Sequence, residues 1–394
     1  IGTEERKLTV GIGPRHADRM TALIWIGYYV EKPWKVGSFG FTHLYDIGAS
    51  DGHREETLTL AQRIDHLDHA LANGVEVVQS LATAPMDDQQ AYARRDRAGK
   101  MRPQGKKKHI PMEVSHPAMR ERFVASAEQG VAELGAHPAF AGMLPCSELR
   151  DKSFPSFNTE HERYRRETGR EVPAEVDKKV LSEEVARRLY PDGIVPDDDP
   201  ILAYYRWFWS GGDGWPSYTG AFGDVYHRYV KRPDFFVFWD PAVRCPPRWG
   251  SGGNVDMLNQ WVYANPEPMN VAGPIEEMFA MAEGRPGQQV MAMTQLICYR
   301  SQMAPKWAKI DPLPDWVKRR PGADFPSIPP DSLQEATWSM IAKPVRGIMY
   351  HGWGTIMPKN TEKRGYCYTN PETRLALSNV LTTVVRPLGP TLLA

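Results

Sequence analysis

The chain has 394 residues, and its 48 lysines and arginines balance its 48 aspartates and glutamates, so the formal net charge at pH 7 is zero. Proteins that bind nucleic acid or an anionic membrane surface normally carry a basic excess, which is missing here. The longest apolar stretches, such as 290–298, are far shorter than the roughly 20 residues that a membrane-spanning helix needs. Length and charge therefore predict a globular chain without a nucleic-acid or membrane partner.

Short, continuously apolar segments recur along the chain and alternate with helical stretches. This alternation is typical of parallel strands that are buried on both faces. The expected strands, in chain order, are 22–29, 41–47, 75–81, 140–146, 235–239, 257–263, 290–297 and 347–350.

Amphipathic helices are expected between these strands. A helix over 58–73 has Leu60, Ile64, Leu67 and Leu71 on one face, and Asn73-Gly74 is a suitable stop. A second helix has Phe123, Ala127, Val131 and Leu134 on one face, and a third begins at Pro274 and ends before Gly284. Two more are expected over 332–342 and from Asn370-Pro371 onward.

The run from 151 to 232 breaks this rhythm, because it is charged, helical in several pieces, and ends in the aromatic segment 204–218. Eight strands with intervening helices and no reversal predict an α/β fold, a closed (β/α)₈ TIM barrel. We expect a single catalytic domain over 1–394 with a helical insertion at 151–232. An open doubly wound sheet more often has a glycine-rich turn after strand one, whereas Gly11–His16 fails the GxGxxG pattern.

Polar and aromatic residues gather where the predicted strands end, and the carboxyl ends of the strands form the active face of such barrels. The candidate substrate-binding residues are His43, Asp46, Trp239, Arg244, Trp261, Tyr263, Asn265, Gln295, Tyr299, Arg300, Tyr350, His351 and Trp353. Aromatic faces stack on the C–H surfaces of sugars, while polar groups orient the hydroxyls. A carbohydrate is the expected partner.

Glycosidic cleavage needs one carboxylic acid to protonate the leaving oxygen and a second carboxylate to attack the anomeric carbon or to activate water. Glu148 is the best candidate for the acid, because it follows an apolar strand, and burial raises the pKa of a carboxyl group. The alternative is that Glu148 pairs with Arg150 and only holds the loop.

Three stretches, one containing Glu148 and two following it, resemble a known family. The segment 135–151 (GAHPAFAGMLPCSELRD), followed by 157–161 (FNTEH) and 164–169 (YRRETG), is similar to the fourth-strand region of clan A glycoside hydrolases, and most similar to the beta-galactosidase-like family 42. In that clan a glutamate at the end of strand four is the acid/base, so the resemblance implies this role for Glu148. It covers roughly residues 20–170 and is architectural beyond them.

The sequence departs from the clan at two positions. Clan A has its glutamate nucleophile at the end of strand seven, where this chain has Gln295, and the asparagine before the acid/base is Ser147 here. Gln295 is then an engineered change, or the second carboxylate is elsewhere with an inverting geometry as one option, or the barrel binds sugars without cutting them. We favour the second explanation, with Asp240 ahead of Glu267 and Asp46. Asp240 as a loop cap before Pro241, and Glu267 in a rigid turn between two prolines, are the competing interpretations.

Signals for other chemistry are weak. His66 and His69 have metal-ligand spacing, but they lie in the middle of a predicted outer helix, and Gly250–Gly253 lacks the GxSxG pattern of serine hydrolases. The cysteines Cys146, Cys245, Cys298 and Cys367 form no CxxC pair, which argues against structural zinc and against a disulfide scaffold. We therefore expect no metal and no cofactor.

Two further expectations concern the aromatic segment and the start of the chain. Of the rings in 204–218, about half should be buried packing, and Trp209 or Trp215 should face the substrate cleft. Ile1 opens directly into the charged residues 4–7, so the chain is compatible with a secreted or periplasmic protein whose signal peptide has been removed.

The sequence thus predicts a glycoside hydrolase acting on an oligo- or polysaccharide. The alternative is a catalytically silent carbohydrate-binding barrel, which Gln295 favours. A metal-dependent barrel hydrolase is a distant third.

Overall fold

The computed structural model describes sixteen stretches of the chain, and the structural findings refer to them. They are residues 19–26, 33–46, 59–80, 90–102, 111–113, 115–145, 155–178, 181–212, 215–240, 254–259, 262, 268–296, 325–326, 328–353, 366–367 and 371–393.

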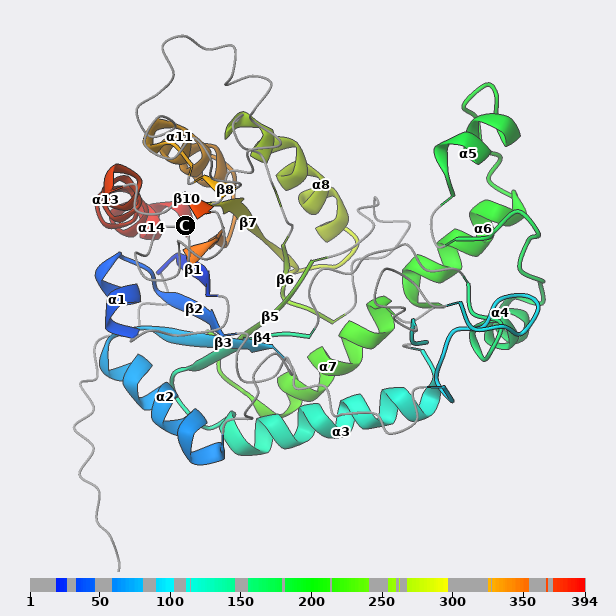
Figure 1. Cartoon of the computed structure of the whole chain (residues 1–394), viewed down its shortest axis with the longest axis horizontal. Coiled ribbons are helices and arrows are strands. Elements are labelled where there is room, and N and C mark those ends of the chain that lie inside the picture. Colours follow the sequence, from blue (N-terminus) through cyan, green and yellow to red (C-terminus); the bar gives the residue numbers. More distant parts are fainter. Residues whose placement is uncertain are drawn as a thin grey trace, which may run out of the picture.

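Eight parallel strands close into a barrel in chain order, and the last strand pairs with the first (Figure 1). They are β1 (Thr21–Ile26), β2 (His43–Asp46), β3 (Glu76–Ser80), β4 (Phe140–Leu144), β5 (Phe236–Trp239), β6 (Met257–Asn259), β7 (Gln289–Gln295) and β9 (Gly347–His351). All eight lie within the stretches expected from the sequence or within two residues of them, and the predicted (β/α)₈ barrel is confirmed.

Helices surround the barrel. Those flanking its strands are α1 (Pro33–Ser38), α2 (Leu60–Ala72), α3 (Pro117–Leu134), α7 (Trp215–Tyr229), α8 (Ala272–Ala282), α11 (Pro330–Ile341), α13 (Pro371–Val380) and α14 (Arg386–Leu393). Short elements accompany them: η3 (Pro268–Val271), η6 (Leu381–Val385), and a small parallel sheet of β8 (Phe325–Pro326) and β10 (Tyr366–Cys367). The start of α2 is fixed by a capping box between Thr59 and Gln62.

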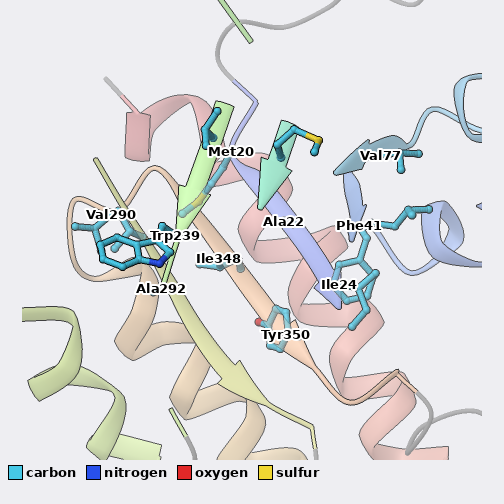
Figure 2. Close-up of a cluster of buried hydrophobic side chains, with 14 of the residues drawn as sticks. Met20, Ala22, Ile24, Phe41, Val77, Trp239, Val290, Ala292, Ile348 and Tyr350 are labelled. Atoms are coloured by element: carbon cyan, nitrogen blue, oxygen red, sulfur yellow. The ribbon is translucent and has the colours of Figure 1, made fainter. Parts of the chain in front are cut away.

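The apolar core has two layers, one inside the barrel and one between the barrel and its helices. Successive side chains of a strand point to opposite faces, so each strand supplies both layers and reads as a continuous apolar run. The inner layer contains Leu23, Trp25, Tyr45, Val78, Leu144, Phe236, Phe238, Met257, Met291, Met293 and Met349. Figure 2 shows part of the outer layer, including Ala22, Ile24, Trp239, Val290, Ala292, Ile348 and Tyr350.

Several helices lie between β4 and β5 before α7. They are α4 (Glu160–Thr168), α5 (Glu183–Leu189), α6 (Pro200–Trp207) and the π-helix η1 (Phe208–Gly212), and α4, α5 and α6 stand to one side of the barrel in Figure 1. They have a separate apolar cluster of Tyr164, Val172, Val176, Ile201, Tyr204, Tyr205, Phe208 and Trp209. Trp209 is 6% exposed there, so the expectation that it faces a cleft is wrong, because helical spacing turns it into this cluster. The side chain of Trp215 lies outside the described residues.

A buried polar network ties these helices to the segment that follows β3. Arg94 donates to the Glu160 carboxylate over 2.8 Å, and the two side chains are 1% and 2% exposed. Glu113, which is fully buried, accepts from the Ser156 hydroxyl over 2.7 Å and from the Thr159 backbone N–H over 3.2 Å. The sequence analysis missed this network, since its members are up to 66 residues apart.

The approach of α7 to the chain before β6 depends on a glycine. A Cβ atom added to Gly223 would lie 1.7 Å from the Asn254 carbonyl oxygen, whereas one added to Gly273 on α8 would meet nothing within 4 Å. We expect Gly223→Ala to lower the free energy of unfolding by about 1–3 kcal/mol or more, because backbone must shift. Gly273→Ala should be neutral or stabilise by up to ~1 kcal/mol. Urea denaturation of both variants checks this, and equal effects would contradict the close approach.

Candidate active site

Polar and aromatic side chains gather at the carboxyl ends of the barrel strands, on the inward-facing positions. Strand pairing places Gln295, His351, Trp25 and Tyr45 at neighbouring positions on four adjacent strands, β7, β9, β1 and β2. They continue the inward alternation of Met293, Met349 and Leu23. Together they line one side of the barrel mouth.

This side has an aromatic floor. The rings of Trp25 and Tyr45 lie 4.1 Å apart between centroids, and the His351 ring meets Trp25 edge-on at 6.0 Å. Trp25 is 7% exposed and Tyr45 is 1% exposed, so their rings are mostly covered in the structure. The arrangement is an apolar floor of two packed rings with one imidazole beside it.

The opposite side has amide and carboxylate groups. Asp240 directly follows β5 and is 7% exposed, while Asn259, at the end of β6, is fully buried. Asp240 and Asn259 each follow the last paired residues, Trp239 and Leu258, and alternation from Phe238 and Met257 points both side chains inward. The Asn259 amide donates from Nδ2 to the Met291 carbonyl oxygen over 2.8 Å. A carboxylate and a carboxamide thus stand side by side on β5 and β6, and Asn259 lies opposite Met291, four residues before Gln295 on β7.

Burial keeps the His351 imidazole uncharged at neutral pH. It lowers the pKa of His351 from 6.5 to about 4. Gln295 is likewise neutral and fully buried beside it. Of the described residues on this part of the mouth, Gln295 and His351 can exchange hydrogen bonds with hydroxyls and carry no negative charge.

The lowered pKa of His351 makes stability depend on pH. The unfolded ring takes up a proton near pH 6.5 and the folded ring only near pH 4, so the unfolded state binds more protons in between, and acidification through this window destabilises the fold. Relative to His351→Gln, the wild-type free energy of unfolding should be constant above pH 7 and fall by on the order of 1–3 kcal/mol towards pH 4. Urea denaturation across this range measures the difference, and parallel curves would contradict it.

Of the residues predicted for the site, the structure brings Asp240, Gln295 and His351 to the mouth from three strands. Asp46 is the last residue of β2, and its side chain lies outside the described residues. Eight others also lie outside the described residues: Glu148, Glu267, Arg244, Trp261, Tyr263, Asn265, Tyr299 and Arg300.

His43 does not lie at the carboxyl end of its strand, contrary to the expectation. It opens β2, and its Nε2 lies 2.9 Å from the Glu76 carboxylate while its Nδ1 lies 2.7 Å from the Thr42 hydroxyl. The ring also meets Phe236 edge-on inside the barrel. His43 is the first residue of β2 and Asp46 the last, so His43 lies at the amino end of the barrel.

Three predicted aromatic residues pack in the outer layer instead of lining the mouth. Trp239, Tyr350 and Trp353 are 1%, 0% and 5% exposed. The Tyr350 hydroxyl lies 2.6 Å from the Thr337 hydroxyl of α11, and burial raises the pKa of this phenol. Because Phe238 and Met349 point into the barrel, the next residues, Trp239 and Tyr350, point outward. Trp353 lies beyond the end of β9 and packs edge-on against Phe39 and Phe41.

The sequence analysis missed Trp25, Tyr45 and Asn259 as mouth residues. All three lie inside predicted strands, where an apolar run alone does not show which residues point into the barrel mouth. Alternation counted from the true strand ends identifies them, because each shares a face with an inner-layer residue two positions earlier: Leu23, His43 and Met257.

Metal-ligating residues do not cluster in the described part of the chain, which holds no group of three or more histidines, cysteines, aspartates or glutamates fit to bind a metal ion. His69 lies 3.4 Å from Asp65 one turn earlier in α2. Among the described helices, none is both long and apolar enough to span a membrane.

Comparison with known proteins gives matches at the level of structure. No family model and no curated protein sequence matches the chain. The beta-galactosidase from the psychrophilic Marinomonas ef1 superposes with a TM-score of 0.60 at 12% identity, over 93% of this chain and 59% of that one. The beta-galactosidase from Bacillus circulans sp. alkalophilus gives 0.59 at 11% identity, over 95% and 57%.

A catalytic mutant of Gan42B, a GH42 beta-galactosidase from G. stearothermophilus, gives 0.57 at 9% identity, over 95% of this chain and 57% of that one. The chain therefore spans less than two thirds of the length of these neighbours. At such identities the likeness shows a shared fold. The resemblance to family 42 barrels that residues 135–169 predicted is confirmed at that level.

Proposed function

We propose that this chain hydrolyses glycosidic bonds of an oligo- or polysaccharide, with Glu148 as the general acid and Asp240 as the second carboxylate. The observation that carries the proposal is the Asp240 carboxylate, which lies inside the barrel mouth at the end of β5. Its neighbour β4 is the strand after which Glu148 follows, four residues beyond Leu144. The fold shared with beta-galactosidases supports the same reaction class.

The described residues of the mouth suit a sugar. Trp25 packs on the buried Tyr45 ring and, at 7% exposed, is the ring that the C–H face of a pyranose would contact. Asn259, Gln295 and His351 supply neutral polar groups, whose hydrogen bonds orient hydroxyls without binding a cation. Neutral groups around a single described carboxylate suit a neutral, polyhydroxylated substrate.

The end of β7 has Gln295, so this strand end supplies no carboxylate for the reaction. A carboxamide carries no negative charge and cannot serve as the nucleophile of a covalent glycosyl intermediate. The partner of Glu148 therefore comes from another strand end. Asp240 is the described candidate, and Glu267 and Asp46 remain as alternatives whose side chains lie outside the described residues.

A catalytically silent carbohydrate-binding barrel is the second candidate function, and the buried amide of Gln295 favours it. In that case the mouth would bind sugars through Trp25, Tyr45 and His351, and Glu148 would be a loop residue. The two candidates differ in turnover.

Proton NMR of an oligosaccharide panel incubated with the chain tests the proposal, with beta-galactosides included because the structural neighbours act on them. A new anomeric signal that needs the protein is expected. If no substrate is cleaved, Gln295→Glu goes through the same panel. Release of sugar by Gln295→Glu alone would show a silent relative of a hydrolase, and silence from both would favour the binding barrel.

A further inference from the structure

The side-chain oxygen of Asn259 is a buried hydrogen-bond acceptor without a donor among the described residues. Its Nδ2 donates to the Met291 carbonyl oxygen over 2.8 Å, and only the amide nitrogen can donate, so this bond identifies the other atom as Oδ1. The side chain is fully buried, and no donor among the described residues reaches Oδ1. An unsatisfied buried acceptor costs about 1–3 kcal/mol, so a donor at this point would stabilise the fold.

Asp240 is the polar neighbour of Asn259. Phe238 pairs with Met257 and Trp239 with Leu258, so Asp240, which directly follows β5, and Asn259, the last residue of β6, come next to these pairs. Adjacent strands lie roughly 4.8 Å apart, and both side chains continue the inward alternation. A carboxylate and an amide oxygen, both acceptors, therefore border the same space inside the mouth. An ionised carboxylate has no proton to give to Oδ1.

A water molecule can serve two acceptors at once, because its two O–H groups donate in different directions. We infer that Asp240 and Asn259 together hold the water molecule that attacks the anomeric carbon, and that the chain hydrolyses its substrate with inversion. Asp240 is the general base and Asn259 is a positioning residue that aims the water. The inference rests on the glycosidase function proposed above.

The reaction is balanced as a single displacement. The water oxygen forms a bond to the anomeric carbon while the bond from that carbon to the leaving oxygen breaks. Glu148 gives its proton to the leaving oxygen, and Asp240 takes a proton from the attacking water. No covalent glycosyl–enzyme intermediate forms, which explains why the end of β7 functions with Gln295 and without a carboxylate.

The first test is the configuration of the first-formed sugar, which proton NMR of wild-type protein with a cleaved substrate measures directly. Inversion is expected. Retention would overturn the inference and leave the proposed hydrolysis intact, whereas failure to cleave any substrate would overturn the proposed function itself. This test needs no variant and so does not depend on the folding of one.

The second test is Asn259→Leu, with Met257→Leu on the same strand as the matched control. Loss of the aiming oxygen should lower kcat by about 10²-fold with KM within about twofold, while the control keeps both values. Azide, a small anion that attacks without a general base, should restore part of the turnover and give a glycosyl azide of inverted configuration. An unchanged kcat, or a lowered kcat that azide does not restore, would contradict the positioning role.

Discussion

Glu148→Gln is expected to lower turnover of a cleaved glycoside by about 10²- to 10⁴-fold, because an amide cannot deliver a proton to the leaving oxygen. Binding should change little, since glutamine preserves the size and most hydrogen-bonding capacity of the side chain. The expected result is a large fall in kcat with a KM close to that of the wild type. Substrates with good leaving groups should be affected least, because they need little protonation.

Initial rates on an aryl glycoside and on an oligosaccharide with the same sugar measure this effect. Glu183→Gln on α5 is the matched control, since its side chain is 79% exposed and far along the chain from the mouth. A variant Glu148→Gln that turns over like the control would assign Glu148 to holding its loop, the alternative in which it pairs with Arg150. The acid would then have to be sought among the remaining carboxylates.

Arg94→Met is expected to lower the free energy of unfolding by about 3–5 kcal/mol, because it leaves the Glu160 carboxylate buried without its guanidinium. The pair is 1% and 2% exposed, so solvent cannot replace the lost partner. Glu160 also accepts from the Ser156 backbone N–H over 3.2 Å and from the Tyr204 hydroxyl over 3.3 Å. Loss of the charge pair should therefore loosen α4 and α6 together.

Urea denaturation measures the total effect, and hydrogen exchange of α4 and α6 locates it. Arg187→Met is the matched control, since Arg187 pairs with Glu183 on the surface of α5 and both side chains are more than three quarters exposed; a change below about 0.5 kcal/mol is expected there. The double variant Arg94→Met with Glu160→Gln should recover much of the stability, because it removes the buried charge. Equal losses for Arg94→Met and Arg187→Met would contradict the account.

The strand order was predictable because the barrel buries both faces of every strand. Each strand then reads as a short apolar run, and the runs 75–81 and 290–297 match β3 and β7 to within two residues at each end. The helices were predictable from their 3.6-residue period, as in α3, whose buried residues include Ala127, Val131 and Leu134. Local pattern and burial agree in these elements, so the sequence alone determined the fold class.

The sequence also placed polar residues near the strand ends, and Asp240, Gln295 and His351 lie there in the structure. It did not separate them from Trp239 and Tyr350, because neighbouring residues of one strand point to opposite faces. A shift of one residue in the end of a strand exchanges the mouth for the helix layer. The direction of these side chains was decided by strand register, which only the closed barrel defines.

Contacts between distant segments could not be predicted from the sequence either, because they also depend on how the chain folds back on itself. Arg94 and Glu160 are 66 residues apart, and either residue alone reads as an ordinary surface charge. The opposite holds for Asn259, which reads as part of an apolar strand until the register places it beside Asp240. The sequence by itself determined which segments become strands and helices, because that depends on local apolar periodicity. The tertiary structure decided which charges are buried together and which groups share the barrel mouth, because both depend on pairing between strands far apart in the chain.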